Sequence, residues 1–391
     1  MTIIFFDDQS RETLLPLTFT RPIADLRLGI LKISEKWLHY FKGETAYRTE
    51  TYLQNKFPFQ SSDENLWING SVCPNSKLVE AVKGLEDQAV LIKNKVFIAA
   101  KTKKQIEGVS DLQYLKQIHF EADFSKINFP EDIFKLNDAE IRSDFNFITK
   151  GRTSKKLSAT NTVIGDDIFV EDGVQAECCT FNTHNGPIYL GKNSQVWEGT
   201  HIRGALALCH DAQIKMGAKI YGATTIGPES RVGGEINNAV IWGYASKGHD
   251  GYLGNAVIGE WCNIGADSNN SNLKNNYTEV KLWDYKTERF RKTGLQFCGL
   301  IMADHAKCGI NTMFNTGTVV GVSANVFGSG FPRNFIADFA WGGAQGFEVY
   351  QLSKVFETTE KVFERRNQVF DENEKEILTE IFKQTEKFRR F

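Results

Sequence analysis

The stretch SKGHDGYLG, residues 246–254, holds the side chain of this sequence best suited to acid–base chemistry. His249 lies among glycines, in a run that has neither the period of a helix nor that of a strand. A neutral imidazole, with an ordinary pKa of about 6.5, can take the proton from an amine as the amine attacks a carbonyl. We therefore take His249 as a candidate general base; the alternative is a surface histidine without a chemical task. Four other histidines lack this setting and are interpreted as structural: His184, His201, His210 and His305.

The element that must position His249 is a repeat of aliphatic residues spaced six apart. Leucine, isoleucine or valine occupies eight consecutive positions at this spacing, from Leu190 to Val232. The spacing also holds at Ile164 and resumes at Ile258. One aliphatic residue, often followed by glycine, and four variable residues make a hexapeptide repeat, in which three short strands form a triangular coil around stacked aliphatic side chains. The sequence therefore predicts a left-handed parallel β-helix over residues 151–335.

Two interruptions of this repeat indicate more than a spacer. Residues 233–254, which include His249, lose the spacing of six. Residues 267–294 form a polar excursion too long for a corner of the coil. Loops on a solenoid lie on its surface and commonly carry its function. A scaffold or spacer without catalysis is the alternative interpretation.

Residues 246–277 resemble the acetyltransferase half of the bacterial bifunctional enzyme that makes UDP-N-acetylglucosamine. The resemblance rests on a Gly-His segment, Tyr-Leu-Gly, Asn-Ile-Gly-Ala and an asparagine-containing loop, which agree without a gap from His249 to Asn272. It implies that His249 is the catalytic base and that Asn272 lies beside the acyl donor. An asparagine amide can also donate a hydrogen bond to the oxyanion that develops in acyl transfer, so Asn272 is a second catalytic candidate.

The same resemblance assigns the acceptor side of the site. Tyr252 and Asn263 fall on residues that hold the sugar phosphate, and Lys247 stands where the family also has a basic residue. The lysine that the family places further upstream to contact the sugar has no counterpart, because Asn237 and Asn238 occupy that neighbourhood. The acceptor is therefore left open between an amino sugar phosphate and a nucleotide.

Residues 1–150 resemble sugar nucleotidyltransferases, whose fold is a doubly wound α/β domain. TIIFFDD is typical of a buried strand, and SRETLLPLTFTRPIADLRLGI follows the family's order of an arginine, Leu-x-Pro-Leu-Thr and a basic residue near a proline. The resemblance implies that Arg11 and Arg21 neutralise a triphosphate and a sugar phosphate. We expect a reduced α/β domain of this type.

Two departures from this family predict weak or absent nucleotidyl transfer. Asp7-Asp8-Gln9-Ser10 stand in place of the glycines that let a backbone approach phosphate. Ser71, in LWINGSV, replaces the aspartate that would hold Mg²⁺, and a hydroxyl is a poor substitute for a carboxylate on a hard cation. Asp7 or Asp8 could take over the metal, although an acidic pair after a strand is also a common capping device.

Residues 336–391 predict a C-terminal helical segment. Val-Phe pairs recur there at a seven-residue step with charges between them, which indicates an amphipathic helix. We expect it to pack on the β-helix or on a neighbouring chain; a partner-binding helix is the alternative. In the preceding FPRNF, Arg333 could offer a cation to the phosphates of coenzyme A.

The composition argues against several classes of protein. A net charge of −2 lacks the basic surplus of nucleic-acid binders. The sequence has no run of 18 apolar residues and no cleavable leader, which predicts a cytoplasmic protein without a membrane partner. The seven cysteines form no C-x-x-C pair, so neither a zinc site nor a disulfide framework is indicated, and we expect no structural metal.

These patterns together predict a homotrimeric enzyme of sugar-nucleotide metabolism. We expect it to transfer an acetyl or other acyl group from acetyl-CoA to an amino sugar phosphate or nucleotide. A trimer follows from a solenoid whose flat faces and interrupting loops a neighbouring copy can complete. The alternatives are nucleotidyl transfer to a sugar 1-phosphate by residues 1–150, and a trimeric scaffold that binds sugar nucleotides without catalysis.

Overall fold

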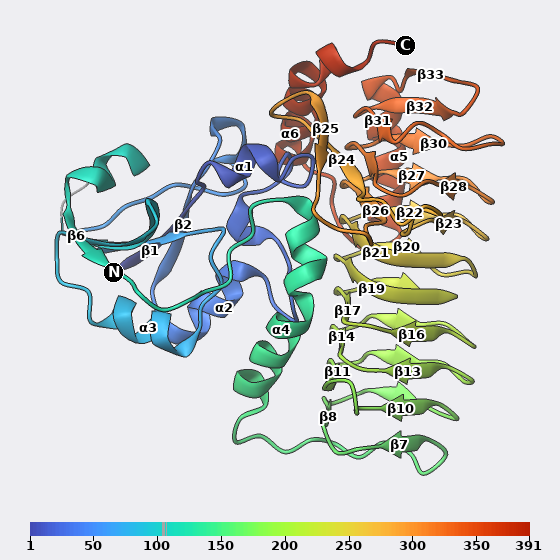
Figure 1. The fold of residues 1–391 in the computed structure, drawn as a ribbon, viewed down its shortest axis with the longest axis horizontal. Helices are drawn as coiled ribbons and strands as arrows, with labels where there is room; N and C mark the ends of the chain where they lie inside the picture. Colours follow the sequence, from blue (N-terminus) through green and yellow to red (C-terminus); the bar gives the residue numbers. More distant parts are fainter. Residues whose placement is uncertain (104–105, 107) are drawn as a thin grey trace. The chain divides into compact units, whose positions relative to one another are not determined.

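The computed structural model describes residues 1–103, 106 and 108–391 (Figure 1). The chain divides into two compact units, and helix α4 (Pro130–Thr149) belongs to the same unit as the repeats that follow it. The units are Met1–Leu26 with Leu31–Phe129, and Arg27–Ile30 with Pro130–Phe391.

The first unit is built around a mixed sheet flanked by short helices. Its elements in the described residues are β1 Thr2–Phe6, α1 Ser10–Thr13, η1 Ile23–Asp25, α2 Ile33–Tyr40, β2 Glu44–Arg48, η2 Thr51–Leu53, β3 Asn65–Asn69, α3 Ser76–Lys83, β4 Ala89–Lys93, β5 Val96–Thr102, η3 Val109–Tyr114 and β6 Lys116–His119. The strand order is β2-β1-β3-β5-β4-β6, with β1 parallel to β2 and β3, and β5 antiparallel to β3 and β4. Strand β1 is buried along its whole length, as expected for TIIFF inside an α/β sheet.

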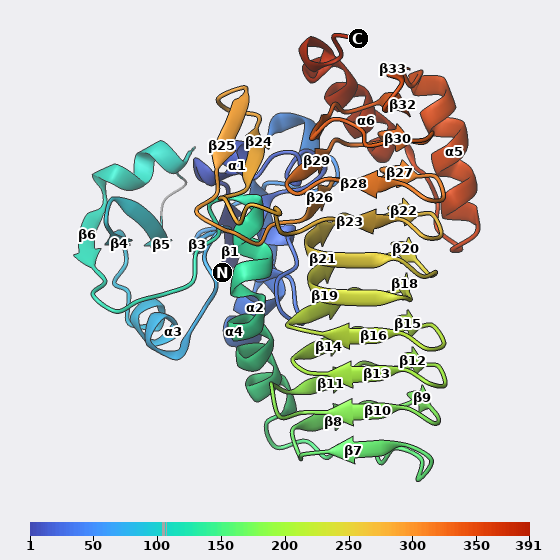
Figure 2. The same cartoon turned by 45° about the vertical axis from the view of Figure 1, so that its right-hand side comes forward.

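The second unit is largely a stack of coils made of short parallel strands, which Figure 2 shows one above another; its last strand pairs antiparallel with the strand before it. Its strands are β7 Thr162–Ile164, β8 Ile168–Val170, β9 Gln175–Ala176, β10 Thr180–Asn182, β11 Ile188–Leu190, β12 Gln195–Val196, β13 His201–Arg203, β14 Leu206–Leu208, β15 Gln213–Ile214, β16 Lys219–Tyr221, β17 Thr224–Ile226, β18 Arg231–Val232, β19 Glu235–Ile241, β20 Ser246–Lys247, β21 Tyr252–Ile258, β22 Asn263–Ile264, β23 Asn269–Asn270, β26 Leu300–Met302, β27 Lys307–Cys308, β28 Met313–Phe314, β29 Thr318–Val320, β30 Asn325–Val326, β31 Phe335–Ile336, β32 Ala340–Gly343 and β33 Gly346–Val349. The predicted fold class is confirmed: an α/β domain, a left-handed parallel β-helix and C-terminal helices.

The aliphatic residues of the repeat form the interior of this β-helix. Leu190 pairs with Leu208 and Leu208 with Ile226, so successive coils are 18 residues, or three hexapeptides, apart. Burying one such side chain contributes about 1.5–3 kcal/mol. Ile164 is 37% exposed, because its strand β7 is the last of its sheet in the described residues and pairs only with β10 there. The uninterrupted run has at most 2% of its surface exposed: Leu190, Val196, Ile202, Leu208, Ile214, Ile220, Ile226 and Val232.

The excursion at residues 267–294 contains an antiparallel hairpin, β24 (Lys281–Asp284) and β25 (Arg289–Lys292). Arg291 places Nη2 2.6 and 2.8 Å from the two carboxylate oxygens of Glu131, in the first turn of α4. Tyr285, in the turn of the hairpin, donates from its hydroxyl to the buried carboxylate of Asp338 over 2.8 Å. The hairpin is therefore fixed to its own unit at its turn and along its second strand.

The C-terminal segment forms two helices, α5 (Leu352–Glu364) and α6 (Glu372–Gln384), and ends in the single turn η4 (Glu386–Phe388). Phe363 of α5 stacks on Trp261, with ring centroids 4.0 Å apart. The segment thus packs on the β-helix of its own chain, which is one of the two packings predicted. No helix in the described residues is both long enough and apolar enough to span a bilayer.

A buried asparagine joins three segments of the second unit. Asn137 of α4 is fully buried, and its Oδ1 accepts hydrogen bonds from the backbone N–H of Gly29 (2.8 Å) and from the hydroxyl of Thr225 (3.0 Å). Its Nδ2 donates to the carbonyl oxygen of Ala223 (2.9 Å). One side chain therefore connects α4, the segment Arg27–Ile30 and the β-helix.

We predict that Asn137→Ala lowers the free energy of unfolding of the second unit by about 3 kcal/mol or more, because it leaves buried donors and acceptors without partners. Asp138→Ala is the matched control. Asp138 is the next residue on α4, and its half-exposed ion pair with Arg142 should contribute at most about 1 kcal/mol. Urea unfolding followed by circular dichroism measures both variants, and equal losses would show that Asn137 does not join these segments energetically.

Candidate functional site

His249 lies at a corner of the β-helix, between β20 and β21. Its side chain is exposed, and no hydrogen bond of its ring is found among the described residues. Ser246 pairs with Asn263, which pairs with Lys307, so the residues three positions later, His249, Ala266 and Ile310, lie at equivalent places in successive coils. The histidine is thus presented on an outer corner.

The local backbone requires a glycine two residues after His249. Gly251 has a φ of 115°, which other residues rarely adopt. A Cβ on it would stand 2.1 Å from the carbonyl oxygen of Ser268 in the next coil. Glycine therefore allows the loop that carries His249 to lie directly on its neighbour.

Lys247 points into the β-helix instead of outward. It pairs with Val232 and occupies the interior column that continues to Ile264, and only 3% of it is exposed. Its Nζ donates to the carbonyl oxygens of Gly233 (2.9 Å) and His249 (2.8 Å). Burial lowers the pKa of Lys247 to about 8. In this geometry the lysine holds the backbone of the histidine loop, whereas the sequence suggested a contact with substrate.

Tyr252 and Asn272 are brought together by a small polar cluster. Asn272 donates from Nδ2 to the hydroxyl of Tyr252 (2.9 Å) and to Oδ1 of Asn255 (2.7 Å). Both hydrogens of this amide are therefore engaged in hydrogen bonds. To bind an oxyanion, Asn272 must first break one of these two bonds. Asn263 stands exposed on β22, paired with Ser246 in the preceding coil.

Sequence reasoning missed three asparagines of this region. Asn255 closes the cluster just described, Asn269 accepts from the backbone N–H of Tyr252 (2.7 Å), and Asn270 holds both backbone groups of Gly254. For Asn269 and Asn270 a signal was present, because the polar excursion begins with the run DSNNSN at residues 267–272.

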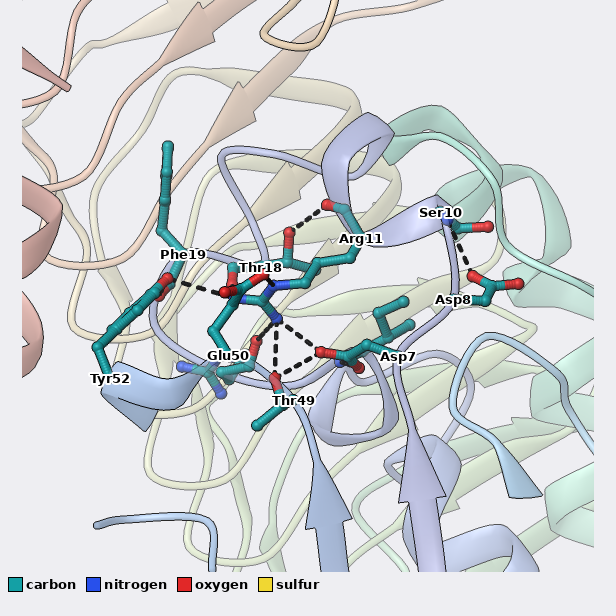
Figure 3. Close-up of polar contacts among 11 residues, drawn as sticks. Asp7, Asp8, Ser10, Arg11, Thr18, Phe19, Thr49, Glu50 and Tyr52 are labelled. Carbon is teal, nitrogen blue, oxygen red and sulfur yellow. Dashed lines mark hydrogen bonds and ion pairs between the residues drawn. The ribbon is translucent and has the colours of Figure 1, made fainter. Parts of the chain in front are cut away.

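In the first unit, Arg11 is enclosed by groups of its own unit (Figure 3). Only 7% of this residue is exposed, and its guanidinium bonds to Asp7 (2.8 Å) and to the carbonyl oxygen of Thr18 (2.6 Å). Burial raises the pKa of Asp7 above its ordinary value, although Arg11 opposes the shift. Arg21 is also buried and lies 3.2 Å from Asp25. Both arginines predicted to bind phosphate therefore have carboxylate partners within the unit.

The residues near Ser71 do not fit a divalent cation. Asp8 accepts hydrogen bonds from Asn69 (3.0 Å) and Ser71 (3.3 Å), and the ammonium of Lys126 lies 3.1 Å from the same carboxylate. Burial would raise the pKa of Asp8, but Lys126 and the hydrogen bonds outweigh it and hold this pKa below its ordinary value. No group of three histidines, cysteines or carboxylates in the described part of the chain is arranged to hold a metal ion. The carboxylate that accepts from Ser71 is therefore already paired with the ammonium of Lys126.

Arg333 lies outside both clusters, in the loop between β30 and β31. It is exposed and lines a cavity of about 580 Å³ together with residues of the β24–β25 hairpin. The sequence-predicted residues of the second unit are therefore spread over several places. His249 is exposed at a corner and Asn263 on β22, whereas Lys247 points into the interior. Tyr252 and Asn272 are hydrogen-bonded to each other, and Arg333 lines this cavity.

Comparisons with known proteins relate part of the chain to transferases. Residues 3–153 match the model of a family described as sugar nucleotidyl transferase. A bifunctional sugar-1-phosphate nucleotidylyltransferase/acetyltransferase of Sulfurisphaera tokodaii is 24% identical over 160 residues, covering 40% of this chain and 37% of that protein. The bifunctional protein GlmU of Methanocaldococcus jannaschii is 32% identical over 87 residues, covering 22% and 21%. The chain thus spans less than half the length of these curated relatives.

Solved structures of acyltransferases are also similar in part. A UDP-N-acetylglucosamine acyltransferase of Francisella novicida gives a TM-score of 0.31 with 11% identity, over 59% of this chain and 76% of that one. The N-acyltransferase AntD of Bacillus cereus, in complex with dTDP and 3-hydroxybutyryl-CoA, gives 0.23 with 11% identity, over 53% and 92%.

We predict that Mn²⁺ raises the melting temperature of the double variant Ser71→Asp/Lys126→Met but not that of the wild-type protein. The variant adds a carboxylate and releases Asp8 from the ammonium, so it supplies the oxygen ligands that a hard cation needs. Lys93→Met, which removes an ammonium paired with exposed Asp123, is the control and should resemble wild type. Thermal unfolding with and without Mn²⁺ measures the effect; a shift in the wild-type protein would contradict the assignment.

Proposed function

We propose that the β-helix transfers an acyl group from acetyl-CoA or a related acyl-CoA to the amino group of a sugar phosphate or sugar nucleotide, in the cytoplasm. The observation that carries the proposal is His249, exposed on a glycine corner and followed by the hydrogen-bonded pair Tyr252 and Asn272. The names of the two curated relatives, both bifunctional and one an acetyltransferase, support it.

The proposed reaction needs one base and one donor. The neutral imidazole of His249 takes a proton from the acceptor amine while the nitrogen attacks the thioester carbonyl carbon, and the C–N bond forms. The tetrahedral oxyanion is stabilised by an N–H donor, for which Asn272 is the candidate. The C–S bond then breaks, and the imidazolium returns the proton to the leaving thiolate. Lys247 acts as a positioning residue, because it fixes the backbone of the histidine loop.

Two other functions are compatible with parts of the chain. The family match at residues 3–153 favours nucleotidyl transfer by the first unit. The carboxylate partners of Arg11 and the ammonium on Asp8 argue against it, because these charges are already compensated. A scaffold that binds sugar nucleotides without catalysis is separated from an acyltransferase by the variant of His249 described below.

We further propose that three copies of the chain associate through the corner that carries His249. Apolar side chains stand exposed at this corner and beyond it: Ile310, at the place equivalent to His249, is 68% exposed, Met313 on the next strand β28 38%, and Phe331 in the loop after β30 55%. Exposed apolar side chains of this size cost free energy in water and are typical of a surface that another protein covers. A neighbouring copy at this corner would also cover the exposed face of His249.

We predict a homotrimer in solution, with three times the chain mass of 44.2 kDa. Ile310→Asp should lower this mass, because it places a charge in the apolar contact. Val369→Asp is the control, since Val369 is 80% exposed on the segment between α5 and α6. Light scattering at micromolar concentration measures all three proteins, and a stable wild-type monomer would refute the proposal.

We predict that His249→Ala lowers kcat at least about 10²-fold and leaves acetyl-CoA binding nearly intact, because the base acts on a proton in the transition state. The rate of the wild-type enzyme should fall at acid pH, where a protonated imidazole cannot act as a base, and this fall should be absent from the residual rate of the variant. Asn272→Ala should also lower kcat, whereas Tyr252→Phe should mainly raise the KM for the acceptor.

His184→Ala serves as the control for this series, because His184 is an exposed histidine at another corner of the β-helix. It should keep the wild-type rate and pH profile. If His249→Ala kept full activity with an unchanged pH profile, the scaffold interpretation would replace the enzymatic one.

A further inference from the structure

The cavity of about 580 Å³ in the second unit has one flat aromatic wall. Trp283 of β24 stacks on Phe335 with ring centroids 4.3 Å apart and planes 13° from parallel, and Phe290 of β25 meets the indole edge-on at 5.4 Å. Trp283 and Phe335 are both partly exposed, although Tyr285 and Phe388 also meet the ring of Phe335 at nearly right angles. An exposed stack of this kind offers a surface on which a planar ring can lie.

The same cavity carries positive charge without compensating carboxylates. Lys281 and Arg333 are exposed, and neither has an ion-pair partner among the described residues. Lys274 uses one hydrogen of its ammonium on the carbonyl oxygen of Glu279 (2.8 Å). None of the described residues that line the cavity is acidic. Three cations around one hollow therefore favour an anion with several oxygens, such as a phosphate.

The walls of the cavity are held in place by an ion pair and by hydrogen bonds to the rest of the unit. The bidentate pair of Arg291 with Glu131 fixes β25, and the buried hydrogen bond from Tyr285 to Asp338 fixes the turn of the hairpin. Asn334 donates to the carbonyl oxygen of Thr316 over 2.7 Å, which ties the loop of Arg333 to the preceding coil. A site whose walls are preformed loses little conformational freedom when a ligand enters it.

We infer that this cavity binds a nucleoside phosphate, with the base against Trp283 and Phe335 and the phosphates on Lys281, Arg333 and Lys274. The inference rests on the proposed function, because that function supplies the ligand. Both the acyl donor and the acceptor of the proposed reaction can carry a nucleotide. One source is the adenosine bisphosphate end of a coenzyme A donor. The other is the nucleoside diphosphate of a sugar nucleotide acceptor. Binding itself does not require His249.

The test is isothermal titration calorimetry of the full chain with adenosine 3′,5′-bisphosphate, UDP and inorganic phosphate. We expect at least one nucleotide to bind at least about 10-fold more tightly than phosphate, because stacking on an aromatic wall adds to the charge term. Preference for the bisphosphate assigns the cavity to the donor, and preference for UDP assigns it to the acceptor. Equal affinity for inorganic phosphate and both nucleotides, or no binding, overturns the inference.

Four variants locate the bound ligand. Trp283→Leu should weaken nucleotide binding at least about 5-fold and leave phosphate binding unchanged, because it removes only the stacking surface. Lys281→Ala and Arg333→Ala should weaken the binding of nucleotide and phosphate alike, and both residues are exposed, so neither change endangers folding. Lys292→Ala, on the same hairpin but outside the cavity, is the control and should bind as wild type. Wild-type affinity in Trp283→Leu and both cation variants would refute the assignment.

His249→Ala distinguishes a failure of this inference from a failure of the proposed function. It should bind the nucleotide with wild-type affinity while losing acyl transfer. A chain that transfers acyl groups but binds no nucleotide in this cavity would refute only the inference. A chain that binds the nucleotide but has no transferase activity would refute only the proposed function.

Discussion

The interior column of aliphatic side chains is the constraint on which the second unit depends. Each coil pairs residue by residue with the next, so a side chain that must face inward fixes which of its neighbours reach the outer corners. Val196, Ile214 and Val232 form one such column, and Lys247 takes the next place in it. An ammonium can occupy an apolar column there only because two backbone carbonyls accept its hydrogens. The loop that carries His249 is thereby tied to the core.

The coils could be predicted from the sequence because one physical requirement, an inward side chain every sixth residue, acts on the uninterrupted run without exception. The inward orientation of Lys247 could not be predicted from the sequence. The step from Val232 to Lys247 is 15 residues, and the step from Lys247 to Ile264 is 17, instead of the 18 of a regular coil. Shortened coils remove the spacing that would mark Lys247 as an inward residue. The same shortening identified the segment as unusual.

In the first unit, the sequence suggested that Arg11 and Arg21 bind phosphates. In the structure, each of these arginines forms an ion pair with an aspartate of the same unit. Asp7 precedes Arg11 by four residues, and Asp25 follows Arg21 by four, so this spacing was a local signal of ion pairing that could have been used. The contact between Lys126 and Asp8 joins residues 118 positions apart and had no such signal. Local pairs are readable from a sequence, whereas distant ones depend on how the sheet brings its loops together.

Charge compensation distinguishes the buried cations of the first unit from the cations that line the cavity of the second. Arg11, Arg21 and the Lys126–Asp8 pair are buried or nearly so, and a buried charge without a partner costs several kcal/mol, so each has found its counter-charge within the fold. Lys281 and Arg333 remain in contact with water, which solvates them without a carboxylate. An anionic ligand therefore gains little in the first unit, where it would compete with existing partners. It gains more in the cavity of the second unit, where it would be the first counter-charge to arrive.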